Sequence, residues 1–207
     1  MAPKNIAKSF LIATATALVV RLFVVEDFRI SSDSMTPNLL KGDLILVSKS
    51  AFNLRLPFSS FELFRTGKPK RSEVVAFSVP EQGTDTYVKR IVALGGDRVE
   101  IKEGSLWING EMAEYQETPE SNQILEKWPS GRSYQITKGK SQLADYGPVD
   151  VPADHFFALG DNRSDSVDSR KWGPVPYSCL KGRVALVWIS VGSSGGVRPS
   201  RWLSAIQ

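Results

Sequence analysis

The 207-residue sequence predicts a mainly β domain built of antiparallel sheet, preceded by one N-terminal apolar helix. Three observations lead to this prediction. Short runs rich in β-branched and aromatic residues alternate with Gly, Pro, Asn and Asp turns through most of the chain. Helical periodicity is almost absent from the same region. One long apolar stretch lies near the N-terminus, separate from the β-rich part.

The apolar stretch covers residues 6–25. It is long enough to cross a bilayer, because twenty helical residues span about 30 Å. Lys4 and Lys8 precede its apolar centre and favour a cytoplasmic N-terminus. We therefore predict a cytoplasmic segment 1–5, a transmembrane anchor 6–25 and an extracytoplasmic β domain 26–207.

Two other interpretations of this stretch stay open. Ala15-Thr16-Ala17 has the small-x-small pattern of a cleaved signal peptide. The stretch is also only moderately apolar, which would suit a helix buried in a protein core. A single span explains more of it, since cleavage after Ala17 would leave the apolar residues 18–25 on the mature protein.

Residues 27–190 predict one antiparallel β domain with a polar, irregular insertion at 111–147. The predicted strands are 43–48, 73–79, 86–94, 98–101, 105–108, 155–159 and 183–190. Asn109-Gly110 directly follows one of them and is a strong hairpin-turn signal. The loose candidates for helix are 52–64 and, with less support, 123–128.

Composition excludes several classes of function. The net charge of +4 and pI near 9.2 are only mildly basic, and the one dense basic run is 68–71, Lys-Pro-Lys-Arg. A nucleic-acid binder usually concentrates its charge in a stripe, so we expect no nucleic-acid partner. The run follows an aromatic and leucine-rich segment, 52–64. Together they would form either a surface that meets acidic lipid headgroups or a solvated turn beside the core.

A single cysteine, Cys179, and a single histidine, His155, restrict the chemistry. An intramolecular disulfide is impossible, and a zinc site of the ordinary Cys/His type cannot be assembled. We expect no metal and no other cofactor. Any Ser-His mechanism would need His155, whose sequence neighbours do not resemble a nucleophile's partner. A hydrolase of this sequence would therefore use another base.

Two segments could supply a nucleophile and a base. Residues 31–39 form a serine-rich turn soon after the apolar stretch. Residues 86–94 form a strand, on which Lys89 and Arg90 lie on opposite faces, so that one cation accompanies an apolar row whichever face is inward. A lysine among apolar neighbours can lose its proton near neutral pH, whereas an arginine cannot. If either residue is a base, it is Lys89.

A third segment, 160–170, is dense in charged and hydroxyl side chains directly after an apolar run. An ordinary polar loop is one interpretation. A calcium-binding loop is a weaker one, because the glutamate that closes a twelve-residue loop is missing.

Taken together and in this order, the three segments resemble the sequence boxes of type I signal peptidase. Residues 34–39, Ser-Met-Thr-Pro-Asn-Leu, are similar to that family's nucleophile box, Ser-Met-x-Pro-Thr-Leu. Residues 87–90, Tyr-Val-Lys-Arg, followed by Gly96-Asp97, are similar to its lysine box. Residues 160–170 resemble its Gly-Asp-Asn-x-x-x-Ser-x-Asp-Ser-Arg box. The resemblance extends from the apolar stretch to about Ile189.

Three positions depart from the family pattern. Asn38 replaces a threonine, Ser31 lies where many members have proline, and Gly95 lies where proline is frequent. None of these departures removes a proposed catalytic atom.

The resemblance implies roles for particular residues. Ser34 would be the nucleophile and neutral Lys89 its general base. Ser166 would hydrogen-bond and orient Lys89. The Ser34 N–H and the Ser32 hydroxyl would form the oxyanion hole. Structural support of the site would come from Asp161 and from an ion pair between Asp168 and Arg170.

By the same resemblance, the protein would be a membrane-bound serine endopeptidase of the signal peptidase I type in the bacterial inner membrane. It would remove signal peptides from secreted preproteins, cleaving after small residues at positions −1 and −3, and its partners would be preproteins and the lipid bilayer. Two alternatives stay open: a specialised Ser/Lys processing peptidase of a conjugation or secretion system, and an inactive membrane-tethered binding domain. Residues 178–181 also fit the Ser-x-x-Lys pattern of penicillin-recognising enzymes, but the companion motifs are missing.

Overall fold

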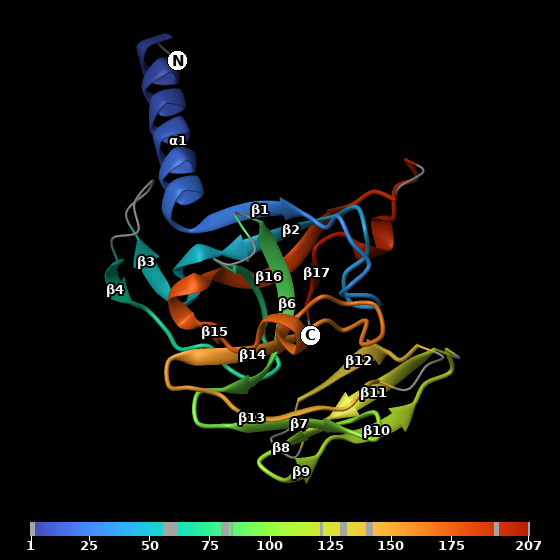
Figure 1. Cartoon of the computed structure of the whole chain (residues 1–207). Helices are drawn as coiled ribbons and strands as arrows, with labels where there is room; N and C mark the ends of the chain where they lie inside the picture. Colours follow the sequence, from blue (N-terminus) through green and yellow to red (C-terminus); the bar gives the residue numbers. More distant parts are fainter. Residues whose placement is uncertain are drawn as a thin grey trace.

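The computed structural model describes residues 3–55, 62–79, 83, 85–120, 122–128, 132–139, 143–192 and 195–206. A helix, α1 (Pro3–Phe23), projects from one side of a β domain whose sheets lie below it in Figure 1. The predicted class, mainly β with antiparallel pairing, is confirmed.

The main sheet has eight strands within the described residues, in the order β1-β2-β16-β5-β6-β14-β15, with β17 paired to β16. Their bounds are β1 Val25–Arg29, β2 Asp43–Ser48, β16 Leu180–Ser190, β5 Val74–Ser78, β6 Thr86–Leu94, β14 His155–Leu159, β15 Val175–Pro176 and β17 Ser204–Ala205. A strand from late in the chain, β16, therefore lies between β2 and β5, which come from its first half.

Three smaller sheets complete the β part that the structure describes. They are β10-β11-β12 (Glu114–Glu117, Gln123–Lys127, Ser133–Thr137), β13-β7-β8-β9 (Tyr146–Asp150, Arg98–Lys102, Ser105–Ile108, Glu111–Met112) and β3-β4 (Asn53–Arg55, Glu62–Arg65). A short helix, α2 (Ser169–Trp172), follows β14, and single 3₁₀ turns occupy Lys49–Ala51, Tyr177–Cys179 and Pro199–Arg201.

Alternation of side chains explains why these strands pack as they do. In β2, Asp43, Ile45 and Val47 are buried and the residues between them are half-buried, as expected of a strand with one face toward the core. In the centre of β6, by contrast, consecutive side chains are buried on both faces. This strand is therefore covered from both sides, and its polar residues must be accommodated inside the protein.

Two expectations about local structure are wrong. Residues 123–127 form β11 rather than a helix, because β10 and β12 pair with them on both sides. The described parts of 52–64 contain β3 and β4 instead of a helix, and residues 56–61 lie outside the described residues.

In its described residues the insertion 111–147 is largely regular and not irregular as expected, since it contains β9 to β12 and the start of β13. Its strands were missed because their exposed side chains are mostly polar and give little apolar alternation.

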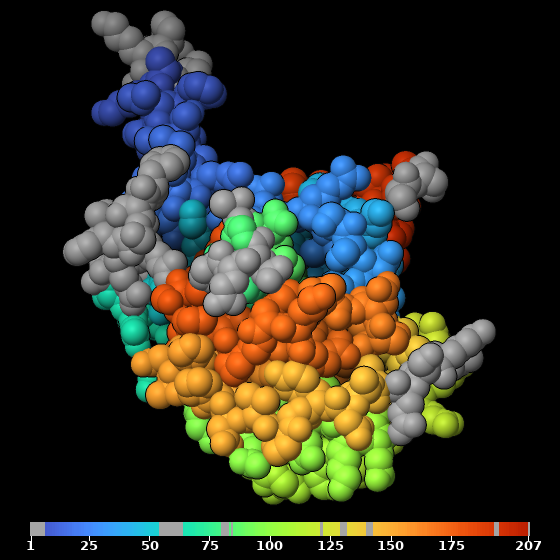
Figure 2. All heavy atoms as spheres, viewed as in Figure 1, coloured from blue at the N-terminus to red at the C-terminus, as the bar shows by residue number. Residues whose placement is uncertain are grey.

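Helix α1 contains most of the apolar stretch and ends at Phe23, after which β1 begins. Its side chains from residue 7 to the last turn are exposed, with Phe10 at 73% and Leu11 at 69%. The helix projects away from the β domain (Figures 1 and 2), so the alternative of a buried core helix is wrong. In the part of the chain that the structure describes, no helix is both long and apolar enough to cross a membrane.

Candidate active site

The candidate site lies where the turn between β1 and β2 meets β6. Lys89 Nζ is 2.6 Å from Ser34 Oγ, although the two residues are 55 positions apart. Lys89 is 4% exposed, and Ser34 is half-buried at the surface of the turn. The structure thus brings together the two residues that the sequence assigned as nucleophile and base.

The environment of Lys89 favours its neutral form. Burial lowers the pKa of Lys89 to about 8, because the ammonium ion loses its hydration. The carboxylates of Asp168 and Asp161 act in the opposite direction, and the Arg170 guanidinium lowers the pKa further. Roughly a tenth of Lys89 is then neutral at pH 7 and about nine tenths at pH 9.

Arg90, on the other face of β6, is buried as well but keeps its charge. Its guanidinium binds Asp161 through two bonds of 2.7 and 2.8 Å and donates to the Ser72 carbonyl at 2.8 Å. The Tyr134 ring lies below it, with the guanidinium carbon 4.0 Å from the ring centroid. Burial alone would lower the pKa of Arg90, but Asp161 more than compensates and the pKa is raised.

Asp161 also contacts the nucleophile turn. The Asn38 side-chain amide donates to Asp161 Oδ2 and to the Gln135 carbonyl, both at 2.7 Å. The residue that departs from the family's threonine therefore links the turn to β12 and to the 160–170 loop.

The loop 160–170 packs directly against Ser34. The Asn162 N–H donates to the Ser34 carbonyl at 3.0 Å. A Cβ atom at Gly160 would lie 2.2 Å from Ser166 Oγ and 2.5 Å from the Ser34 carbonyl oxygen. Only glycine fits at this position, and Ser166 Oγ therefore lies close to the backbone of Ser34.

The hydrogen bond predicted between Ser166 and Lys89 is not formed. Ser166 Oγ is buried and has no hydrogen-bond partner among the described residues. Lys89 Nζ instead faces Ser34 Oγ.

The predicted ion pair between Asp168 and Arg170 is present, with bonds of 2.8 Å from Nε and 2.7 Å from Nη2. Asp168 caps the N-terminus of α2 through the Arg170 N–H and also accepts the Gly160 N–H at 3.0 Å. Arg170 Nη1 donates to the Arg163 carbonyl at 2.7 Å. The pair thus closes the 160–170 loop on itself.

A cleft of about 370 Å³ opens beside Ser34 and Lys89. One wall comes from the end of β1 and the following turn, including Ile30 and Ser31, and the other from the start of β6, including Thr86 and Tyr87. Ser32 Oγ lies 3.1 Å from Ser34 Oγ at this surface. An extended chain could lie between two segments that are themselves extended.

Several buried residues near the site were not predicted. The carboxylate of Glu126 on β11 binds Arg163, and Tyr134 and Gln135 on β12 contact Glu126, Arg90 or Asn38. Arg90 offered a usable signal, because a buried arginine needs a carboxylate. Glu126 gave none, since a lone glutamate in a polar segment is ordinary.

His155 is not among the residues that line the cleft at Ser34 and Lys89. His155 Nδ1 contacts the Ala153 carbonyl at 2.8 Å at the start of β14. Among the described residues, no group of three or more His, Cys, Asp or Glu side chains is placed to hold a metal ion.

A serine hydroxyl beside a desolvated lysine amine is the arrangement that a serine hydrolase with a lysine base requires. The model of the family "Signal peptidase, peptidase S26" matches residues 4–189. The chain therefore belongs to the signal peptidase family and is a serine endopeptidase. The resemblance noted in the sequence is confirmed.

Two relatives compared by sequence agree with this assignment. Signal peptidase I of Pseudomonas aeruginosa is 36% identical over 202 residues, covering 88% of this chain and 71% of the relative. Signal peptidase I P of Bacillus subtilis subsp. natto is 33% identical over 164 residues, covering 79% and 75%. The crystal structure of a signal peptidase I from Enterococcus faecalis V583 aligns with a TM-score of 0.38 at 26% identity, over 56% of this chain and 96% of that one.

Proposed function

We propose that the protein removes signal peptides from secreted preproteins with Ser34 as nucleophile and Lys89 as general base. The observation that supports this best is the 2.6 Å distance between Lys89 Nζ and Ser34 Oγ, at a lysine that is almost fully buried. A charged lysine cannot accept a proton, so the burial that lowers its pKa is part of the mechanism.

In the first step, Ser34 Oγ attacks the scissile carbonyl carbon while Lys89 Nζ accepts the hydroxyl proton. The Ser34 N–H and the Ser32 hydroxyl donate to the oxyanion, a contribution of about 3 kcal/mol per donor in comparable enzymes. Lys89 then gives the proton to the leaving amine as the C–N bond breaks. Water, deprotonated by Lys89, hydrolyses the resulting ester and restores Ser34.

Ser166 would act in this reaction only after Lys89 has become protonated. Transfer of the proton creates an ammonium ion in a buried place, where it needs an acceptor. Ser166 Oγ is buried and close to the Ser34 backbone, and it has no hydrogen-bond partner in the part of the chain that the structure describes. It would accept a hydrogen bond from the ammonium and hold it for transfer to the leaving group.

The substrate would bind as an added strand in the cleft between Ser31-Ser32 and the start of β6. Main-chain hydrogen bonds would give affinity, and shallow pockets would exclude large side chains at positions −1 and −3. This arrangement suits an extended segment that follows a signal peptide.

The N-terminal segment 6–25 would anchor the protein in the bacterial inner membrane, with the N-terminus in the cytoplasm and the β domain outside. The exposed apolar side chains of a helix that projects from the domain support this proposal. Carbonate washing should leave the protein in the membrane pellet, and protease added to spheroplasts should digest the β domain. Full protection of that domain in sealed spheroplasts would contradict its export.

The decisive experiment for the activity uses the detergent-solubilised protein and a preprotein. Wild type should release the signal peptide, whereas Ser34→Ala and Lys89→Ala should not. His155→Ala is the matched control and should cleave normally. Cleavage by Ser34→Ala at the wild-type rate would show that another nucleophile acts.

A further inference from the structure

A buried ion pair joins the three-stranded sheet β10-β11-β12 to the candidate active site. Glu126 on β11 binds Arg163 through two bonds of 2.6 and 2.7 Å, and the two side chains are 0% and 2% exposed. The same carboxylate accepts the Tyr134 hydroxyl at 2.7 Å and the Trp128 indole N–H at 3.3 Å. Glu126 is thus fixed by three donors at a position that water does not reach.

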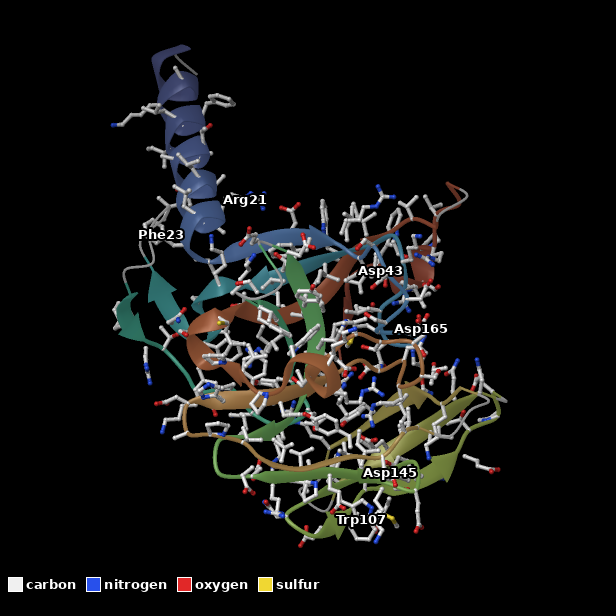
Figure 3. All side chains as sticks on the ribbon, in the orientation of Figure 1. Arg21, Phe23, Asp43, Trp107, Asp145 and Asp165 are labelled. Carbon is white, nitrogen blue, oxygen red and sulfur yellow. The ribbon has the colours of Figure 1, made fainter. Side chains whose placement is uncertain are left out.

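These contacts reach both sides of the site. Arg163 belongs to the 160–170 loop, which lies between the main sheet and the three-stranded sheet near the labelled Asp165 in Figure 3. The Tyr134 hydroxyl is hydrogen-bonded to Glu126, and the Arg90 guanidinium lies over the Tyr134 ring. Arg90 is the sequence neighbour of Lys89 on β6. One carboxylate therefore supports the loop and, through Tyr134, the strand that carries the base.

The path from Glu126 to Ser34 is short and consists of hydrogen bonds and one peptide link. The Arg163 guanidinium donates hydrogen bonds to Glu126, and the Arg163 backbone N–H donates to the Thr137 carbonyl at the end of β12. The preceding residue, Asn162, donates its N–H to the Ser34 carbonyl at 3.0 Å. A shift of Arg163 therefore moves the residue that holds the nucleophile's backbone.

We propose that Glu126 is a positioning residue for the reaction, which sets the geometry of Ser34 and Lys89 through Arg163 and the 160–170 loop. This proposal rests on the proposed function of Ser34 and Lys89. The proposal also gives a role to the insertion 111–147. Its sheet β10-β11-β12 would pack against the segments that carry Ser34 and Lys89 and hold them in place.

The bidentate geometry of the pair between Glu126 and Arg163 is more precise than stabilisation of the fold alone would require. A buried ion pair often stabilises a fold no more than a well-packed apolar pair of similar volume does. A bidentate pair, however, fixes direction and distance, which an apolar contact does not. The ion pair should therefore matter more for turnover than for folding.

The test compares Glu126→Gln and Glu126→Asp with Glu114→Gln, an exposed glutamate on the adjacent strand β10, in the full-length enzyme with a preprotein substrate. Glu126→Gln should lower kcat at least tenfold with KM within about twofold of wild type. Glu126→Asp keeps the charge and should recover part of the loss. Glu114→Gln should match wild type.

The pH profile separates positioning from mere loss of folded protein. The charged groups that act on Lys89 are Asp168, Asp161 and Arg170, and Glu126 is not among them. If the 160–170 loop loosens, water reaches Lys89 and the ascending limb of kcat against pH should move to higher pH. A lower fraction of folded enzyme would reduce kcat without moving that limb, and this result would overturn the proposal.

Glu126→Gln leaves Arg163 buried without a carboxylate, so it could unfold the protein. The double variant Glu126→Met/Arg163→Met removes both charges and keeps the volume apolar. It should fold, as judged by circular dichroism and thermal melting, and still show the low kcat and the shifted limb. A folded double variant with wild-type kcat and pH profile would overturn the proposal. Failure of the wild-type enzyme to cleave would instead contradict the proposed function.

Discussion

Lys89 and Arg90 are sequence neighbours and both are buried, but their side chains lie in opposite electrostatic environments. Arg90 cannot lose its proton and receives the carboxylate of Asp161. Lys89 has no bonded carboxylate among the described residues, and its pKa falls to about 8. The difference between Arg90, which stays charged, and Lys89, the proposed base, therefore lies in whether the surroundings supply a direct ion pair.

The pH dependence of cleavage should follow from Lys89 if this residue is the base, as proposed. Its pKa in the folded protein lies below the ordinary value, so its neutral form accumulates as the pH rises through about 8. We expect kcat/KM to rise from pH 6 to 9 with a midpoint near that value. Lys89→Arg should lose about 10²–10⁴-fold, since guanidinium cannot act as a base. Near-normal turnover of Lys89→Arg would contradict the assignment of the base.

Gly160 offers a second test at the scale of single residues. In Gly160→Ala the added methyl group would overlap Ser166 Oγ and the Ser34 carbonyl oxygen. Both lie at the reacting centre, so the collision should displace the nucleophile, and we expect kcat to fall at least tenfold. Steady-state kinetics measures this, and Gly96→Ala is the comparison, because a Cβ there meets no atom within 4 Å although its φ of 92° adds strain. Equal activity of the two variants would argue against close packing at Gly160.

At the scale of elements, the strands of the main sheet were largely predictable from sequence. Segments 43–48, 86–94 and 155–159 were predicted with the bounds that the structure has, because β-branched and aromatic runs end at clear turn residues. Residues 123–127 were not, since pairing with β10 and β12 decides their conformation and no local pattern reports it.

The site was predictable only in part, for a physical reason. The segments carrying Ser34, Lys89 and Ser166 were recognised by their resemblance to known boxes, and no periodic pattern placed them together. The partners of the buried cations are even less visible, since Arg90 and Asp161 are 71 residues apart. An ion pair between residues so far apart in sequence produces no recognisable pattern in either segment alone.

The pair between Arg90 and Asp161 should dominate the stability of this region. Asp161→Asn leaves the Arg90 guanidinium buried without its counter-charge, and we expect a loss of about 3–5 kcal/mol in the free energy of unfolding. Urea unfolding measures it. Asp150→Asn is the matched control, because Asp150 pairs with Arg98 at the surface and should cost less than about 1 kcal/mol. Equal losses of unfolding free energy in Asp161→Asn and Asp150→Asn would contradict the claim that burial makes the first ion pair the more important one.

At the scale of the whole molecule, the C-terminal segment is bonded to the start of β2. Arg201 donates to Asp43 at 2.6 Å and to the Asn38 carbonyl at 2.8 Å, while Arg198 donates to the Ser190 hydroxyl at 2.8 Å. Asp43, labelled in Figure 3, is fully buried. The chain beyond the family match at 189 therefore braces the turn that carries Ser34.

Arg201→Ala should destabilise the protein by about 2–4 kcal/mol near pH 7, because it leaves Asp43 buried with weaker compensation. Burial alone would raise the pKa of Asp43, but Arg201, the Leu40 N–H and Ser190 together lower it. Stability from a lowered carboxyl pKa is present above the unfolded value and lost as pH falls, so the deficit of Arg201→Ala should shrink below about pH 4. Urea titrations at the two pH values test this, with Arg98→Ala as the surface control. A deficit that does not depend on pH would indicate lost packing instead.

The position of β16 has a consequence for biosynthesis. In the sheet, β16 (Leu180–Ser190) joins two parts of the candidate site: β2, which follows the turn with Ser34, and the pair β5-β6, in which β6 carries Lys89. A growing chain therefore cannot assemble Ser34 with Lys89 in this sheet until some 190 of its 207 residues have been made. The joining of β16 to the sheet would therefore be the step of synthesis that brings the proposed nucleophile and the proposed base together.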